Sequence, residues 1–92
     1  MDAVAPLLDL MAIESHDSVD TIRDHLFDII PGATVDPSGC VVARRGDPAA
    51  GPHVVLNSHM DVVPPHIPPE QDGDIITGRG ACDAKGCLTP ML

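Results

Sequence analysis

The chain has 92 residues, a length that holds one small domain. Five basic against fourteen acidic side chains give a formal net charge of −9, and Phe27 is the only aromatic residue. The charge disfavours binding to a phosphate backbone, and the lack of aromatic side chains disfavours a stacking surface for single-stranded nucleic acid. No apolar run approaches the ~20 residues of a membrane span, and the acidic N-terminus is unlike a signal peptide. Three cysteines without framework spacing fit a reducing compartment, so we expect a cytoplasmic protein with neither nucleic acid nor membrane as partner.

The acidic excess is carried by aspartate, since the chain has twelve Asp and two Glu against four Arg and one Lys. Solvated helix faces explain this excess. Adaptation to high salt is the alternative explanation, because a hydrated and self-repelling surface keeps a protein soluble there. Composition alone does not separate the two interpretations.

The first third of the chain predicts two helices. Apolar residues recur at helical spacing in the first, namely Val4, Leu7, Leu8, Leu10, Met11 and Ile13. The stripe of the second is formed by Val19, Ile22, Leu26, Ile29 and Ile30. Ser18 is placed to cap this second helix, and Asp20 lies near its positive end. The Pro31-Gly32 pair then ends it.

From residue 33 the pattern is that of strands. Short strands are predicted over residues 33–36, 40–45, 53–58 and 74–77. Residues 40–45, with the loop over 46–51, are typical of a hairpin arm and its turn, and the consecutive apolar residues of 53–58 predict a strand buried on both faces. Residues 62–74 hold four prolines and predict no regular structure, whereas 78–86 form a glycine-rich loop and 87–92 start a helix. Since an apolar run reaches Leu92 without a helix-ending signal, we expect the chain to be part of a longer protein.

Candidate metal chemistry is concentrated between residues 57 and 86. His59 and Asp61, two residues apart at the end of a predicted strand, project to the same side. A neutral imidazole is a good zinc ligand, and a neighbouring carboxylate fixes its tautomer. Asp83 offers an oxygen ligand from a later loop, and a carboxylate can bridge two metals ~3.5–4 Å apart.

Each feature taken alone has an ordinary explanation. A His-x-Asp pair is common, and an Asp in a glycine-rich loop often bonds its own backbone. The indication of a site comes from the combination: a buried-type strand, His-x-Asp at its end, a proline-rich crossover, and then Gly-x-Gly-x-x-Asp-x-Lys-Gly before a helix. The C-terminal ends of strands in open α/β sheets are where sites gather.

At this point the sequence resembles a known family. SHMDVVP at 58–64 and DGDIITGRGACDAKG at 72–86 are similar to the paired signature of the M20 zinc metallopeptidases and amidohydrolases. The resemblance implies that His59 is a ligand of the first metal and that Asp61 is the catalytic aspartate that orients it. It also implies that Asp83 bridges both metals and that the Asp83–Ala84 peptide bond is cis.

The same resemblance implies a fold and a function. Residues 1–92 are expected to be the N-terminal segment of an α/β, two-metal, aminopeptidase-like catalytic domain, a central β-sheet flanked by helices that is incomplete here, with the lid and dimerisation domain absent. The implied cofactor is Zn²⁺, with Co²⁺ as an alternative, and the implied assembly is a homodimer of the full-length protein. The implied reaction is hydrolysis of the amide bond of an N-acylated amino acid in amino-acid biosynthesis.

Within the family, the wording of the motifs leans towards the acetylornithine deacetylase and succinyl-diaminopimelate desuccinylase branch. An exopeptidase or dipeptidase acting on a small peptide is the alternative in the same class, and a non-catalytic remnant is the alternative outside it. The family's paired glutamates, one of them the general base, have no counterpart here, because Glu14 and Glu70 lie in other contexts. We therefore expect the 92-residue chain alone to be inactive.

The remaining polar residues have simpler interpretations. Cys82 and Cys87, in a C-x4-C spacing, are expected to be small buried side chains rather than metal or redox groups. His66 is a residue that could face the site from the proline-rich loop. Arg79 and Lys85 either meet a substrate carboxylate or pair with nearby acidic residues, of which the candidates are Asp72, Asp74 and Asp83.

Overall fold

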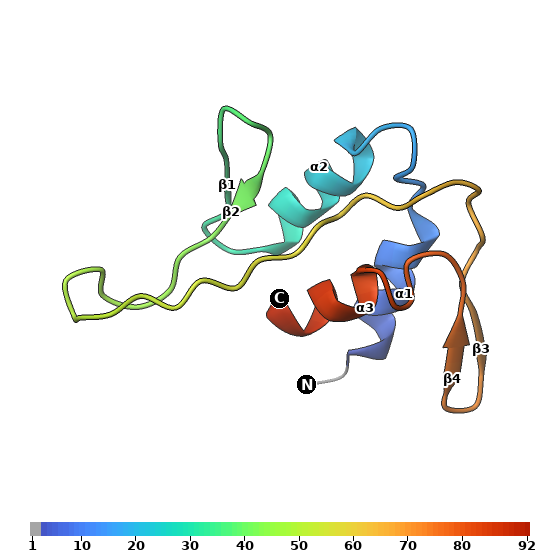
Figure 1. Cartoon of the computed structure of the whole chain (residues 1–92). Coiled ribbons are helices and arrows are strands. Elements are labelled where there is room, and N and C mark those ends of the chain that lie inside the picture. The colour runs from blue at the N-terminus through green and yellow to red at the C-terminus, as the bar shows by residue number, and fades with distance from the viewer. Residues whose placement is uncertain (1–2) are drawn as a thin grey trace.

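The computed structural model describes residues 3–92, so residues 1 and 2 of the expected segment 1–92 lie outside the described residues. Its helices are α1 (Val4–Ala12), α2 (Asp20–Ile29), α3 (Lys85–Leu88) and the 3₁₀ turn η1 (Thr89–Met91). Its strands are β1 (Thr34–Val35), β2 (Val41–Val42), β3 (Glu70–Asp72) and β4 (Ile75–Thr77). The strands form two separate antiparallel pairs, β1–β2 and β3–β4, on opposite sides of the helices (Figure 1).

The helices pack around a small apolar core. Leu10 of α1 and Ile22 and Leu26 of α2 are buried together, with Leu88 of α3 packed against them. This confirms both predicted stripes for the most part. The prediction is wrong for Ile29, which remains 44% exposed because it lines a hollow that opens to solvent between α1, α2 and the C-terminus. It is also wrong for Val4 at the start of α1, which is 37% exposed.

The predicted C-terminal end of α2 is confirmed, whereas the N-cap position is occupied by Val19 and not by Ser18, which lies one residue earlier. The Asp20 backbone N–H donates to Ser18 Oγ at 3.2 Å, so this hydroxyl satisfies the first free amide of the helix. Asp20 lies in the first turn and pairs with Arg23. The helix ends before Pro31, and Gly32 takes a φ of +73°, a conformation that glycine adopts without a steric penalty.

The hairpin near residue 40 is formed differently from the expectation. Strand β2 pairs backwards with β1, in the register Thr34↔Val42 and Val35↔Val41, and not forwards across the loop over 46–51. The reason is the turn at Asp36, whose Oδ1 accepts the N–H groups of Ser38 and Cys40, each at 2.9 Å. Such an aspartate turn closes the chain on itself within a few residues.

The segment 53–58 contradicts the prediction of a strand buried on both faces. It is extended but unpaired, and its apolar side chains are exposed: Val54 at 87%, Val55 at 83% and Leu56 at 68%. A strand of this type needs neighbouring strands at its edges and cover on both faces, and residues 3–92 supply neither. The described chain is therefore a mixed α and β structure without a central sheet flanked by helices.

The proline-rich stretch 62–74 is only partly irregular. Glu70–Asp72 form β3 and pair with β4, in the register Glu70↔Thr77 and Asp72↔Ile75, which corrects the expectation of no regular structure. The prolines end at residue 69, so the residues after it keep the backbone N–H groups that a ladder needs. The predicted C-terminal helix is present and starts at Lys85, two residues early. None of the helices within residues 3–92 is long and apolar enough to cross a membrane.

Candidate metal centre

The candidate site is formed by two segments that are far apart in the sequence. His59 and Asp61 lie on the extended chain that crosses the helices, and Asp83 lies in the turn just before α3 (Figure 1). The first segment is fixed where the Val62 N–H donates to the carbonyl oxygen of Ser15, at 3.2 Å, in the turn between α1 and α2. The second is closed by the Gly86 N–H, which donates to the Gly80 carbonyl at 3.2 Å.

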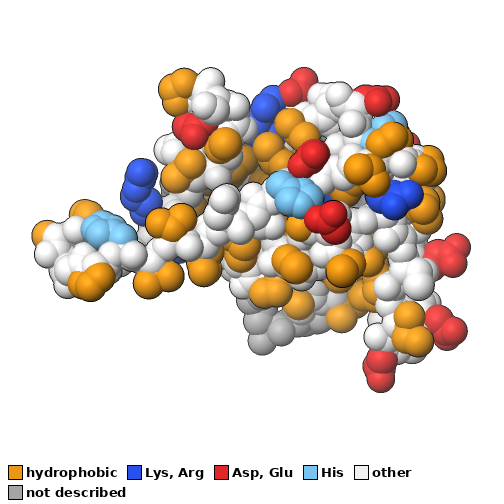
Figure 2. All heavy atoms as spheres, viewed as in Figure 1, with side chains coloured by type: hydrophobic (Ala, Val, Ile, Leu, Met, Phe, Trp, Pro, Cys, Tyr) orange, Lys and Arg blue, Asp and Glu red, His pale blue; other side chains and the backbone are white. Residues whose placement is uncertain are grey.

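The imidazole of His59 lies between two carboxylates. Its Nε2 is 2.8 Å from Asp83 Oδ1, and its Nδ1 is 3.1 Å from Asp61 Oδ1 and 3.0 Å from the Asp61 carbonyl oxygen. The side chain of His59 is 49% exposed and that of Asp83 is 86% exposed, so all three groups are open to solvent and to an incoming ion. Figure 2 shows a histidine between two acidic side chains on this face.

The electrostatics follow from this contact. The hydrogen bond to Asp83, and after it the bond to the Asp61 carbonyl, raises the pKa of His59 above its usual value of 6.5. Both ring nitrogens face acceptor oxygens, and only the protonated ring has an N–H for each of them. A metal ion at Nε2 requires the neutral ring, so it displaces this proton.

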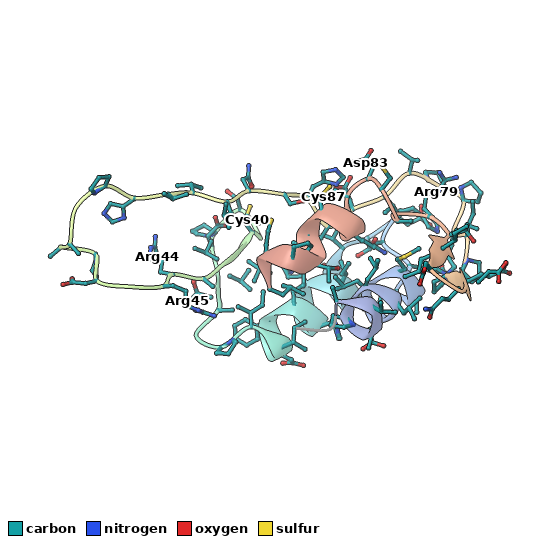
Figure 3. All side chains as sticks on the ribbon, turned by 90° about the horizontal axis from the view of Figure 1, so that it is seen from below. Cys40, Arg44, Arg45, Arg79, Asp83 and Cys87 are labelled. Carbon is teal, nitrogen blue, oxygen red and sulfur yellow. The ribbon has the colours of Figure 1, made fainter. Side chains whose placement is uncertain are left out.

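An open hollow of about 580 Å³ adjoins the three side chains. Arg79, Cys82 and Thr77 also line it, whereas His66 does not. Figure 3 shows Asp83 above α3 and Arg79 towards the β3–β4 hairpin. The hollow is large enough for a small substrate next to the candidate ligands.

The donor set suits zinc but is incomplete. An imidazole nitrogen and carboxylate oxygens are ligands that Zn²⁺ takes, and catalytic zinc sites have three protein ligands. Within residues 3–92 no group of three or more His, Cys, Asp or Glu side chains is arranged to hold a metal ion. His59 and Asp83 therefore offer two ligands. The Asp83–Ala84 peptide bond is cis, as the family resemblance implied, and so is Pro64–Pro65.

Neither of the two cations near the site forms an ion pair with an acidic side chain of residues 3–92, which contradicts the expected pairing. The Arg79 Nε–H donates to the Pro65 carbonyl at 3.1 Å. Lys85 is 1% exposed, and its Nζ donates to the Ile13 carbonyl at 2.8 Å. The partner of Lys85 was not predictable from spacing, because 72 residues separate the two. The sequence offers one indication of this contact: α1 has no basic residue in its last turn, so a cation from elsewhere in the chain is favourable at its C-terminal end.

The cysteines also differ from the expectation. Cys82 and Cys87 are exposed and unpaired with another cysteine, not buried. The Cys87 thiol is 3.6 Å from the Cys82 carbonyl oxygen, to which it donates, so it closes the turn that carries Asp83. Exposure follows from the small size of the chain, since few segments are available to cover this loop.

Comparison with known proteins places part of the chain in a family. Residues 55–92 match the profile of peptidase family M20/M25/M40. A putative LysW-lysine/LysW-ornithine hydrolase of Pyrobaculum aerophilum is 36% identical over 97 residues, covering 100% of this chain and 28% of that protein. The LysW-lysine/LysW-ornithine hydrolase of Sulfurisphaera tokodaii is 54% identical over 39 residues, covering 42% of this chain and 11% of the relative. A succinyl-diaminopimelate desuccinylase of Granulibacter bethesdensis is 41% identical over 58 residues, which are 54% of this chain and 15% of that enzyme.

No solved structure matches the chain. The chain spans less than a third of the length of these curated relatives. The family match begins four residues before His59 and includes Asp61 and Asp83. Residues 55–92, which carry both motifs, therefore match the M20 peptidase family, as the resemblance of these motifs implied.

Proposed function

We propose that this chain is the N-terminal part of a metal-dependent amidohydrolase that hydrolyses the amide bond of an N-acylated amino acid. The observation that carries the proposal is the contact of His59 with Asp83 at 2.8 Å, beside an open hollow and inside the segment that matches the family. The proposed setting is the cytoplasm, and the proposed assembly of the whole protein is a homodimer.

In this proposal each of the three residues has a role. His59 and Asp83 hold the metal, Zn²⁺ or Co²⁺, through Nε2 and the carboxylate oxygens. Asp61, next to Nδ1 at 3.1 Å, accepts its hydrogen bond and keeps the Nε2 lone pair free for the metal. When bound, the metal polarises the amide carbonyl and lowers the pKa of a bound water.

The general base and the remaining ligands are proposed to lie outside this chain. Two ligands do not make a tight zinc site, and the chain spans at most 28% of the three relatives described above. The 92-residue chain alone is therefore proposed to be inactive.

The names of the relatives support an amino acid in amide linkage as the substrate. Two are named for LysW-lysine and LysW-ornithine, and one for succinyl-diaminopimelate. Each name joins an amino acid to a second group. Succinyl-diaminopimelate, from the name of a relative, and acetylornithine, from the resemblance of the motifs, are the small substrates to test first, with dipeptides as probes of the exopeptidase alternative.

The test begins with the intact mass of the native protein in its source cells, which we expect to be several times 9.6 kDa. The purified native protein is then assayed with these substrates, with and without a chelator. We expect chelation, His59→Ala and Asp83→Ala each to lower turnover at least a hundredfold. His66→Ala, a histidine that does not line the hollow, serves as the matched control.

Three results would contradict the proposal. A native mass of 9.6 kDa would mean that the half-site stands alone. Turnover by the isolated chain would overturn its proposed inactivity. Cleavage of dipeptides in preference to N-acyl amino acids would favour the exopeptidase.

A further inference from the structure

A buried lysine closes the end of α1 from far along the chain. Lys85 is 1% exposed, and its Nζ donates to the Ile13 carbonyl at 2.8 Å. Ile13 is the residue that follows α1, and the helix has no basic residue in its last turn. The last carbonyls of a helix lack partners within the helix and carry its negative partial charge, so a cation is favourable there. Lys85 thus caps α1 by a tertiary contact.

The same turn holds the other half of the candidate site. Ser15, two residues after Ile13, accepts the Val62 N–H through its carbonyl at 3.2 Å. Val62 follows His59 by three residues, and Lys85 follows Asp83 by two. Residues 13–15 therefore fix both segments that meet where His59 contacts Asp83.

Lys85 and Val62, which hold the two segments to residues 13–15, both pack against Gly80. A methyl group at Gly80 would lie 2.9 Å from Lys85 Cδ and 3.2 Å from Val62 Cγ1. A glycine at position 80 therefore lets the Lys85 stem and the Val62 side chain pack closely against the backbone of this residue. A methyl group at Gly86 would overlap the Ala81 carbonyl, so the turn around Asp83 is closed just as tightly.

Filling the core does not explain a lysine at this position. Burial lowers the pKa of Lys85, which reflects the unfavourable removal of its ammonium from water. Methionine occupies a similar volume without this penalty. What methionine lacks is the bond to the Ile13 carbonyl, so the function of the lysine lies in that bond.

We propose that Lys85 is a positioning residue that holds Asp83 against His59 by joining the Asp83 turn to the turn between α1 and α2. The inference deepens the proposed function. It rests on that function for the metal, but the geometry of the metal-free site tests it independently.

The experiment compares Lys85→Met with two references in the purified protein. Asp83→Asn removes the carboxylate that His59 contacts. Ser15→Ala removes a buried hydroxyl of the same turn that has no partner within residues 3–92. The first readout, without metal, is the ¹⁵N chemical shifts of the His59 ring. We expect Lys85→Met to move the Nε2 signal towards its position in Asp83→Asn, and Ser15→Ala to leave it in place.

The second readout is the affinity for Zn²⁺ alone. We expect Lys85→Met to weaken it about tenfold or more, the range seen when a group behind a metal ligand is removed. Lys85→Arg keeps a charged donor and is expected to recover most of this loss. Ser15→Ala is expected to leave the affinity unchanged.

The outcomes separate this inference from the proposed function. A folded Lys85→Met variant with unchanged His59 signals and zinc affinity would overturn the inference, since a lysine that only fills space behaves in this way. Where Lys85→Met does not fold, Lys85→Gln replaces it under the same criteria. A wild-type protein that binds no zinc while Lys85→Met still moves the His59 signals would overturn the metal proposal and support the role of Lys85.

Discussion

The candidate site depends on one imidazole held at both nitrogens. Asp83 approaches Nε2 of His59, where a metal is proposed, and Asp61 approaches Nδ1 from the opposite side of the ring. The pair His59 and Asp61 was predictable, because alternate residues on an extended chain share a side. The contact with Asp83 was predictable only through the family resemblance, since spacing does not bring residues 59 and 83 together.

The pKa of His59 provides a first test at this scale. In the metal-free protein we expect it above 6.5, and we expect Asp83→Asn to lower it more than Asp61→Asn, because Asp83 is the largest cause of the rise and the Asp61 carbonyl survives its substitution. The measurement is a titration of the His59 ring signals by NMR. Equal values in wild type and Asp83→Asn would contradict the contact.

The sign of the stability effect follows from the raised pKa. A folded-state pKa above the unfolded one contributes stability that is fully present below the unfolded value and is lost as pH rises through the folded one. Wild type should therefore exceed Asp83→Asn in thermal stability at acid pH, with the difference fading as pH rises through the folded pKa of His59. Thermal unfolding of both proteins across this pH range measures it.

The two carboxylates are expected to differ in their effect on metal binding. Asp83→Ala removes a proposed ligand of the metal, next to Nε2 of His59. Asp61→Ala removes only the hydrogen-bond acceptor at Nδ1 of the same ring. We expect zinc affinity to fall further in Asp83→Ala than in Asp61→Ala, and to fall in wild type as pH drops, because the ring must lose its proton. Calorimetric titration with zinc measures both. A larger loss in Asp61→Ala would reverse the assigned roles.

At the scale of elements, local patterns predicted the helices well and the strands poorly. The buried residues of α1 and α2 form one core, which Val41 of β2 and Leu88 of α3 help to cover, so a short chain suffices to bury them. Residues 53–58 need partner strands that the described chain lacks. Strand β3 forms in the stretch 62–74, for which its prolines predicted no regular structure, because the last of these prolines is residue 69. Helical signals are local, whereas strand pairing depends on distant segments.

The core of the helices gives the second kind of test. Leu26 is 3% exposed, and Ile29 on the same helix is 44% exposed. We expect Leu26→Ala to lower the free energy of unfolding by about 2–5 kcal/mol. Ile29→Ala, the matched control, should lower it by less than about 1.5 kcal/mol, because little of its side chain leaves water on folding. Urea denaturation measures both, and equal losses would place Ile29 in the core.

The uncovered segment 53–58 predicts association between molecules. Unpaired backbone with exposed Val54, Val55 and Leu56 is a template for strand pairing. We expect the isolated chain to self-associate and Val55→Lys to reduce this association. Ile75→Lys, on a strand that is already paired and with a side chain 64% exposed, is the control and should change little. Sedimentation velocity at several concentrations distinguishes the variants, and equal association in all three would locate the contact elsewhere.

For the whole molecule, the long-range contacts determine what the sequence could reveal. The chain spans 45 × 29 × 19 Å, and its two hairpins lie on opposite sides of the helices (Figure 1). The β1–β2 hairpin contacts the core through Val41 of β2. The helices could be predicted because periodicity is local, whereas the roles assigned to the site residues stay predictions. The bond of Lys85 to Ile13 could not, because it depends on how the two ends of the chain meet.

The net charge of −9 predicts how salt affects the whole molecule. Repulsion among carboxylates destabilises the folded chain. Salt weakens this repulsion, because the screening length falls from ~10 Å at ~0.1 M to ~3 Å at ~1 M. We expect the unfolding temperature to rise with NaCl and to level off below ~1 M, where screening is nearly complete. KCl in place of NaCl should give the same curve, because screening depends on ionic strength. A rise that continues to several molar would instead favour a surface adapted to high salt, the second interpretation of the aspartate excess.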